Sequence, residues 1–275
     1  RFISTARDGR GDEREFLRDY FNSTGQMNSN VFLKGYQWPF DSRKVMGGSS
    51  IVDILVYIET VLKGRRAFMD FRRNPEGFSF DDLSPEARDY LTRSKALLPT
   101  PIERLQTMNP GAIALYKDHG IDITREPLEI AVCAQHNNGG LAANHWWESL
   151  NLKHLFPVGE VNGSHGVYRP GGSALNSGQV AGFRAAEYVA NRYAAWSVSR
   201  ESIQQAAAGA VTGLKAWIGK SVKSRAAWEK ERRILQERMS RAGAHIRSKQ
   251  DIQGAAADAW KQWLKVEADG LKYSG

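Results

Sequence analysis

Residues 133–190 read CAQHNNGGLAANHWWESLNLKHLFPVGEVNGSHGVYRPGGSALNSGQVAGFRAAEYVA, and this stretch decides the fold prediction. Three segments within it are dense in Gly and Asn and also carry a His, a Glu and an Arg. They are QHNNGG at 135–140, FPVGEV at 156–161 and HGVYRPGGSALN at 165–176. Glycine lets the backbone approach a ligand closely or adopt a positive φ. The polar residues follow short apolar runs, so we expect them at strand ends and in loops, where functional sites usually lie.

The last of these segments opens a long helix, which the sequence predicts from Leu175 to Tyr193. The first turn of a helix has backbone N–H groups without a partner in the helix, and its dipole is positive at that end. A glycine-rich start leaves this end accessible. We therefore expect it to face an electron-rich group.

In order and spacing, the three segments resemble the succinate dehydrogenase, fumarate reductase and aspartate oxidase flavoproteins. Members of that family carry a His strand ending in Gly-Gly, a Gly-Glu segment after a short apolar strand, and a His-Gly-x-x-Arg-x-Gly-Gly-x-x-Leu loop that opens a helix. Each segment alone is a weak signal, but three in order across about sixty residues are specific. The resemblance implies an α+β fold and FAD as the cofactor.

The family opens with a Gly-x-Gly-x-x-Gly unit that holds the dinucleotide pyrophosphate, and the sequence has no such unit near its start. We therefore expect the C-terminal portion of a fumarate-reductase-like flavoprotein, without the dinucleotide-binding half. The resemblance implies three parts. Residues 1–126 would be part of the capping or substrate domain, 127–198 the C-terminal part of the FAD-binding domain, and 199–275 a helical domain.

The resemblance assigns substrate binding to His136 and Arg169. Read alone, His136 would be an ordinary hydrogen-bonded histidine and Arg169 a solvated arginine. At the matched positions, the family uses the His and the Arg to bind a substrate carboxylate, which suits a charged imidazole and a planar guanidinium. This sequence departs from the family at Asn137 and Asn138, where an aromatic residue and a Met are usual, so the resemblance leaves the substrate open.

The resemblance also assigns three residues to the cofactor. Glu160 matches the family's Glu that contacts the flavin dinucleotide, although a surface or helix-capping carboxylate is the plain alternative. Ala174 and Leu175 match the positions whose backbone meets the flavin ring. Because those are backbone contacts, the replacement of the family's common Ser by Ala174 does not remove them.

The expected proton donor is missing. Family members that act on the succinate–fumarate pair carry a second Arg in the helix corresponding to Ser50–Leu62, and alignment on Glu59 places Ile54 there. An alkyl side chain cannot carry a proton. Arg43, Arg65 and Arg66 lie nearby in sequence but not at the matched position, so the sequence names no proton donor.

Hydrophobic spacing and capping residues predict further elements. We expect a turn or two of helix over Asp12–Tyr20, a loop over Gln26–Asp41 and an amphipathic helix over Ser50–Leu62. Ala67–Phe71, Pro127–Gln135 and Leu155–Val158 are predicted strands, with Leu141–Ala143 as a hairpin partner. Helices are predicted to begin at Ser84-Pro85, Thr100-Pro101 and Asn109-Pro110, and three more over Glu201–Ile218, Ala226–Ala242 and Asp251–Val266.

Composition and net charge limit the classes of function that the chain could have. The 275 residues carry a net charge of +8, and the pI is about 9.6. Basic residues mixed with acidic ones are typical of solvated helix faces, so we expect no nucleic-acid partner, although a basic helical nucleic-acid binder stays as a weaker alternative. No apolar run approaches the ~20 residues of a membrane span. The single Cys133 favours a reducing compartment and hence a cytoplasmic protein, and the histidines show no metal-ligand spacing.

The resemblance thus implies an FAD-dependent oxidoreductase of the fumarate reductase class, acting on a CH–CH bond of a small carboxylate-bearing substrate. It would exchange electrons with an unidentified donor or acceptor, and the 275 residues alone would be inactive. The alternative is a non-catalytic folded fragment or subunit that serves assembly through its helical domain.

Overall fold

The computed structural model describes residues 1–9, 12–37, 40–133, 140–163, 173–193 and 197–272. The described chain divides into two compact units. Unit 1 contains residues 1–132, and unit 2 contains the described residues from Cys133 onward.

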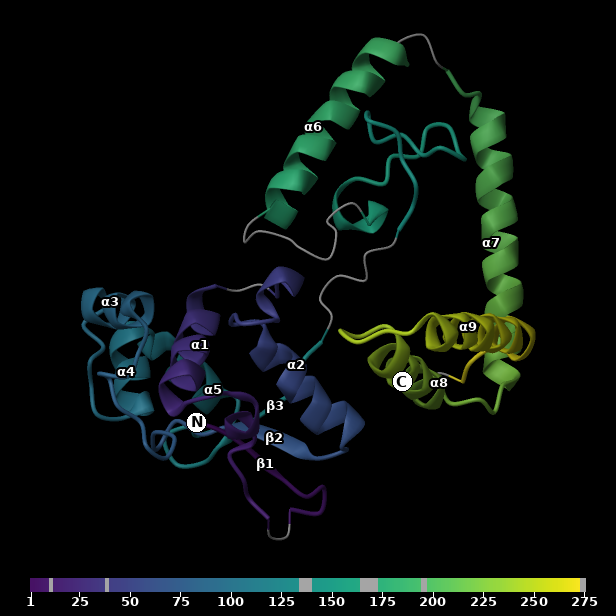
Figure 1. Ribbon diagram of the computed structural model, residues 1–275. Coiled ribbons are helices and arrows are strands. Elements are labelled where there is room, and N and C mark those ends of the chain that lie inside the picture. Colours follow the sequence, from purple (N-terminus) through teal and green to yellow (C-terminus); the bar gives the residue numbers. More distant parts are fainter. Residues whose placement is uncertain (10–11, 38–39, 134–139, 164–172, 194–196, 273–275) are drawn as a thin grey trace. The chain divides into compact units, whose positions relative to one another are not determined.

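Unit 1 combines a small sheet with helices (Figure 1). Its strands are β1 (Phe2–Thr5), β2 (Arg66–Met69) and β3 (Leu128–Ile130). Its helices are η1 (Phe16–Tyr20), α1 (Thr24–Tyr36), η2 (Ser42–Lys44), α2 (Ile51–Tyr57), η3 (Ile58–Leu62), α3 (Pro85–Arg93), α4 (Pro101–Met108) and α5 (Pro110–Asp118). The sheet is antiparallel in the order β1-β2-β3, so β2 is its centre.

The core of unit 1 forms where α2 packs beside η1 and the sheet. Val52, Leu55 and Val56 of α2 are buried against Phe16 and Ala67. Their spacing is that of one helix face. The helix predicted over Ser50–Leu62 is confirmed, but its buried face differs from the predicted apolar stripe, because Ile54 is half-buried and Leu62 is 61% exposed. The helix continues as one π-helical turn, η3. Burying this apolar face stabilises the unit at roughly 25 cal/mol per Å² removed from water.

Several helix starts are confirmed. Thr100 and Glu103 form the reciprocal capping box at α4. Ser84 accepts a hydrogen bond from the backbone of Ala87 at the start of α3, and Pro85 occupies the first position, where its missing N–H costs nothing. Ser50 does not cap α2. Its hydroxyl instead accepts from the backbone N–H of Asp41 at 2.9 Å.

The loop predicted over Gln26–Asp41 is wrong, because most of this stretch is helix α1. Ser23 caps it by accepting from the backbone N–H of Gln26. Asn28, Ser29 and Asn30 are all buried although they are polar. Ser29 donates to the carbonyl of Gly25 and also accepts from the backbone N–H of Ser84, 55 residues away. The inward side of α1 therefore mixes apolar residues such as Met27 with buried polar ones, and a distant segment satisfies part of the polar set.

Unit 2 contains η4 (Gly159–Asn162) and four α-helices. They are α6 (Ser173–Arg192), α7 (Arg200–Lys223), α8 (Trp228–Ala242) and α9 (Lys249–Asp269). The helices predicted from Leu175 and from residue 201 onward are thus confirmed. Within unit 2, α8 and α9 are joined by Glu231, which accepts from Gln262 and Lys265 at 2.8 and 2.7 Å.

Two predicted strands are wrong. Leu155–Val158 is irregular, and Leu155 and Val158 are exposed rather than buried, because the segment leads directly into the short helix η4. Among the described residues of the predicted strand, 127–133, none pairs with Leu141–Ala143. Ala143 instead forms an isolated bridge with Ser149, while β3 pairs with β2. The α+β class is confirmed, and the division at 126 and 198 stays a prediction.

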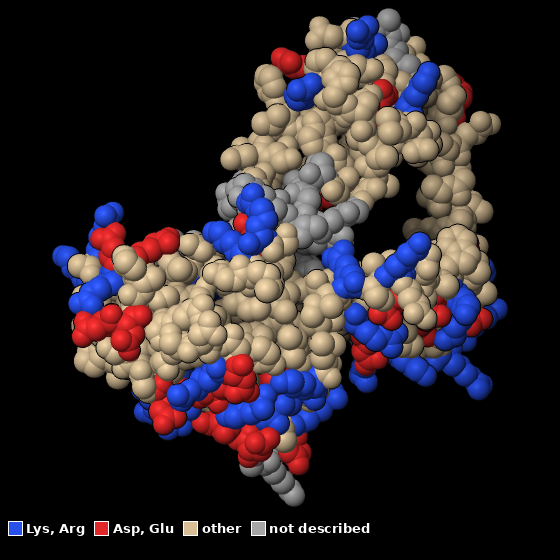
Figure 2. Space-filling model, in the orientation of Figure 1, with Lys and Arg blue, Asp and Glu red and all other residues tan. Residues whose placement is uncertain are grey.

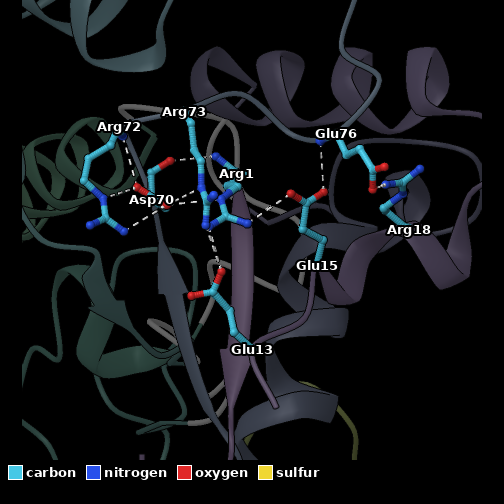
Figure 3. A network of polar contacts seen from close by, with 8 residues as sticks. All are labelled: Arg1, Glu13, Glu15, Arg18, Asp70, Arg72, Arg73 and Glu76. Carbon is cyan, nitrogen blue, oxygen red and sulfur yellow. Dashed lines mark hydrogen bonds and ion pairs between the residues drawn. The ribbon is translucent and has the colours of Figure 1, made fainter. Parts of the chain in front are cut away.

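Ion pairs gather along the edge of unit 1 that carries β1 and the segment after it (Figure 2). At the end of β2, the fully buried carboxylate of Asp70 accepts from Arg72 at 2.8 Å and from Arg1 at 3.1 Å, and Arg73 lies 3.7 Å away (Figure 3). Burial alone would raise the pKa of Asp70, but hydrogen bonds from Arg72 and Arg1 outweigh it and lower the pKa to about 2.

Replacement of Asp70 by Asn should destabilise unit 1. A carboxyl whose pKa falls from 3.8 to about 2 on folding contributes about 2 kcal/mol above pH 4. That contribution is lost as the pH falls through the folded pKa, so the difference between wild type and Asp70→Asn should shrink from pH 5 toward pH 2. Urea unfolding followed by circular dichroism measures it. Glu76→Gln, at an exposed ion pair with Arg18, should change stability little. An equal loss at every pH would contradict the charge argument.

Candidate functional site

The described parts of the three predicted segments are brought together by backbone-to-backbone contacts at glycines. At the end of the first segment, a Cβ on Gly140 would lie 2.2 Å from the carbonyl oxygen of Val161 and 2.6 Å from the carbonyl carbon of Asn162. The next residue, Leu141, donates its backbone N–H to that same Val161 oxygen at 3.0 Å. Only glycine fits at position 140 without a shift of the backbone.

A second glycine contact joins η4 to helix α6. Gly159 has a φ of +76°, and a Cβ on it would lie 3.7 Å from the Cα of Gly178. The positive φ disfavours any residue with a side chain at position 159. Gly178 lies one helical turn beyond Ala174, so this contact places η4 beside the first two turns of α6. The Gly-Gly segment, the Gly-Glu segment and the start of α6 therefore form one local structure.

Three of the predicted site residues belong to this local structure. Glu160 is exposed on η4. Ala174 is half-buried and Leu175 is 77% exposed in the first turn of α6. The structure therefore brings the predicted cofactor residues into neighbouring elements. His136 and Arg169 lie outside the described residues, so the convergence of the imidazole and the guanidinium stays a prediction.

The described part of the site is acidic. In 140–163 and 173–178, the carboxylates are Glu148 and Glu160, and Lys153 is the one Lys or Arg. The start of α6 adds partial positive charge through its N–H groups. This arrangement can accept hydrogen bonds from hydroxyl groups at Glu160 and can favour negative charge at the helix start. Binding of a carboxylate would depend on cations elsewhere.

Sequence reasoning missed a buried carboxylate that fixes the loop before η4. Glu148 is 8% exposed and accepts a short hydrogen bond from the hydroxyl of Tyr193, together with the backbone N–H of His154 at 3.1 Å. The bond from Tyr193 is the main reason that the pKa of Glu148 is lowered, and it raises the pKa of Tyr193 to about 12. The partners are 45 residues apart, so no local pattern could reveal them.

Aromatic rings surround this carboxylate. The ring of Trp146 stacks on Tyr188 of α6 with centroids 5.7 Å apart, and the guanidinium of Arg184 lies 4.8 Å from the Trp146 ring. Phe156 meets Tyr188 and Tyr193 edge-on. The loop is therefore held against the C-terminal half of α6 by rings and a buried carboxylate, while the glycines hold its other end.

The described residues form neither a metal cluster nor a membrane span. Within the part of the chain that the structure describes, no group of three or more His, Cys, Asp or Glu side chains could hold a metal ion. Over the same residues, every helix is too short or too polar to cross a bilayer.

Comparison with known proteins gives partial matches in sequence. Over 84 residues the chain is 45% identical to one subunit of the fumarate reductase (CoM/CoB) of Methanothermobacter marburgensis, which covers 30% of this chain and 14% of that protein. It is 44% identical over 77 residues to an uncharacterized FAD-dependent oxidoreductase of Methanocaldococcus jannaschii, which covers 26% of this chain and 14% of that protein. It is 27% identical over 125 residues to the L-aspartate oxidase of a Nostoc species, which covers 41% of this chain and 22% of that protein. No family model matches the chain.

Comparison with solved structures gives a match over nearly the whole chain. A variant of the E. coli quinol-fumarate reductase FrdA matches 97% of this chain and 40% of its own length, with a TM-score of 0.58 and 20% identity. A quinol-fumarate reductase with menaquinol matches 100% of this chain and 42% of its own chain, with a TM-score of 0.60 and 20% identity. The chain thus has the fold of about two fifths of such a chain, and its sequence matches span a smaller share of its relatives.

Replacement of Gly140 by Ala should destabilise unit 2, because the added Cβ meets backbone atoms that cannot move aside independently. We expect a loss of about 1–3 kcal/mol, the usual cost of overpacking. Gly182→Ala is the matched control, since nothing lies within 4 Å of a Cβ at that position in α6, and an alanine in a helix interior should stabilise by up to ~1 kcal/mol. Urea unfolding of both variants measures the difference. Equal stability would show that the close approach at Gly140 is not a constraint.

Proposed function

We propose a flavoenzyme function from the premise that this chain belongs to the succinate dehydrogenase, fumarate reductase and aspartate oxidase flavoprotein family, as its C-terminal portion. The whole protein would be an FAD-dependent oxidoreductase of the fumarate reductase class, acting on a CH–CH bond. Its dinucleotide-binding half would precede the residues present here. The observation that carries the proposal is the local structure in which Gly140, η4 and the start of α6 meet through glycine backbones.

The described residues fit FAD as the cofactor. The exposed carboxylate of Glu160 is suited to accept hydrogen bonds from ribose-type hydroxyls. The backbone N–H groups of Ala174 and Leu175, in the first turn of α6, are suited to electron-rich atoms of the flavin ring. Bound flavin would supply hydride transfer to or from carbon. The helix start would favour negative charge on the ring system and so contribute to catalysis electrostatically.

His136 and Arg169 would bind the carboxylate groups of a small substrate. A guanidinium holds a carboxylate with two parallel hydrogen bonds, and a protonated imidazole donates one more. Reduction of a carbon–carbon double bond beside a carboxylate builds negative charge on that carboxylate. The two cations would therefore bind the transition state more strongly than the ground state and lower the barrier.

The proton for the second carbon must come from another group. Ile54, at the position where the family carries an Arg, is a half-buried alkyl side chain in α2. The nearby Glu59 is fully buried and is ion-paired with Arg14 at 3.0 Å and Lys63 at 2.6 Å. Those contacts hold unit 1 together. The proton donor, the electron partner and the substrate beyond its carboxylate thus stay open, and the cytoplasmic location stays a prediction.

A second candidate function is assembly without catalysis, through the helical part. Apolar side chains are exposed on its helices, among them Leu214 of α7 (57%) and Trp260 and Trp263 of α9 (62% and 50%). Large exposed aromatic side chains are typical of contact surfaces. Titration of FAD into the 275-residue chain distinguishes the two functions, because tight binding would argue against a purely structural role.

The full-length protein should purify with a flavin absorption spectrum. Arg169→Lys should keep the flavin and lower kcat/KM by about 10²-fold or more, because a point charge replaces a bidentate fork. Glu160→Gln should weaken FAD binding, whereas the matched control Glu187→Gln, at an exposed position farther along α6, should not. Spectra, FAD titration and steady-state kinetics measure these effects. A well-folded, colourless full-length protein would rule out the flavoenzyme proposal.

A further inference from the structure

Unit 1 contains a large hollow with a mainly apolar lining. Its volume is about 820 Å³, which is in the range of cavities that bind small molecules. Side chains from the three strands and from α1, α2 and α4 line it. The apolar lining includes Met27, Val31, Phe32, Phe78, Leu105 and Met108. A ligand with an apolar body would remove this surface from water.

The charged residues of the lining are ion-paired with one another, with the exception of Arg104. The pairs are those of the Arg1 side chain with Glu15 and Asp70, and of Lys34 with Asp53. The guanidinium of Arg104 donates to the carbonyl of Leu98 at 2.6 Å and to the side-chain oxygen of Asn74. Both of these acceptors are neutral. Among the described residues, no carboxylate is ion-paired with Arg104, so the lining has one buried cation without an anion.

Aromatic rings surround this cation and keep water from it. Arg104 is 5% exposed, and its guanidinium carbon lies 5.7, 5.2 and 5.6 Å from the ring centroids of Phe32, Phe78 and Phe80. Burial lowers the pKa of Arg104 to about 10. The guanidinium is still charged at neutral pH, and the rings offset only part of the lost hydration. An anion beside it would offset more of that loss.

Asn28 places an unsatisfied hydrogen-bond donor in the same part of the lining. It is 3% exposed, and its side-chain nitrogen Nδ2 has no hydrogen-bond partner among the described residues. A buried donor left without an acceptor costs free energy comparable to a lost hydrogen bond. Asn28 precedes Phe32 by one helical turn, so the two share one face of α1, and Arg104 lies over the Phe32 ring. Water would satisfy Asn28, but only an anion would also neutralise Arg104.

We propose that the hollow binds a small apolar monocarboxylate, with the chemistry of a medium-chain fatty acid. Its carboxylate accepts a hydrogen bond from Asn28 and lies beside the guanidinium of Arg104, and its apolar body packs against Val31, Leu105 and Met108. A single negative charge matches the single unpaired cation of the lining. None of the lining residues is among those proposed to bind the flavin or the substrate carboxylates, so the inference goes beyond the proposed function and does not rest on it.

Calorimetric titration of the full-length protein with decanoate and with decanol tests the proposal. The two probes share one alkyl chain and differ in the charged group. Decanoate should bind at least about tenfold more tightly than decanol, which is the usual effect of a hydrogen bond to a charged group. Equal affinities would show that apolar burial alone drives binding and would overturn the proposal. Failure of both probes to bind would overturn it as well.

Variants of the two polar residues locate the carboxylate. Arg104→Met keeps an unbranched side chain without the charge, and it should weaken decanoate binding by about tenfold while leaving decanol binding unchanged. Arg93→Met, at an exposed arginine of α3 that is ion-paired with Asp89, is the matched control and should change neither affinity. Asn28→Leu removes only a donor without a partner. It should weaken decanoate binding severalfold even if Arg104→Met does not fold.

A larger side chain in the wall gives a second, independent readout. Val31→Trp should fill part of the hollow and weaken the binding of both probes, whereas Leu115→Trp, at a 57% exposed position of α5 outside the lining, should not. Unchanged decanoate binding in Val31→Trp and Asn28→Leu would place the probe elsewhere and contradict the proposed site. The flavin spectrum of the same protein reports separately on the proposed function. A colourless protein that binds decanoate as expected would support this site and reject the flavoenzyme.

Discussion

The candidate site depends on the close approach of peptide backbones at three glycines. At Gly140 the chain passes so near Val161 that a Cβ would overlap its carbonyl oxygen, and Gly159 and Gly178 let η4 lie against α6. These contacts set where Glu160 and the first turn of α6 stand relative to each other. Glycine thus acts here first as a packing residue. The glycines are needed first for close packing of the loop against its own chain. The same lack of a side chain also lets the backbone approach a ligand closely.

Buried carboxylates play a corresponding part elsewhere in the molecule. Glu59 and Asp70 are fully buried in unit 1. Each is held by a cation near it in sequence, Lys63 or Arg72, and by a distant one, Arg14 or Arg1. Glu148 in unit 2 is held by a tyrosine and by the backbone. Buried charge with unsatisfied partners is costly, so each carboxylate selects the one arrangement that satisfies it. These groups fix the register of loops that hydrophobic burial alone would leave free to slide.

Local chemistry could be predicted from the sequence, and distant pairing could not. The capping box at Thr100 and the cap at Ser84 each depend on residues within one turn, and the structure has them as predicted. Helix α1 was missed because polar residues lie on its buried side among apolar ones, and Ser29 there accepts from the distant backbone of Ser84. The hydrogen bond from Tyr193 to Glu148 joins residues that are 45 positions apart. Such partners have no signature in a local window, so sequence reasoning treats them as solvated.

The described contacts indicate the family, but they do not identify the substrate. The glycine contacts involve only backbone atoms, so they would form whatever molecule the site binds. The charge that would choose a substrate must come from side chains, and the described part of the site contributes Glu160 and no cation in the first turn of α6. Ile54 removes the proton carrier that the family would place in α2. A shared framework with different side chains is the expected outcome when one fold serves several reactions. The resemblance to the family therefore supports the flavin more strongly than it supports fumarate.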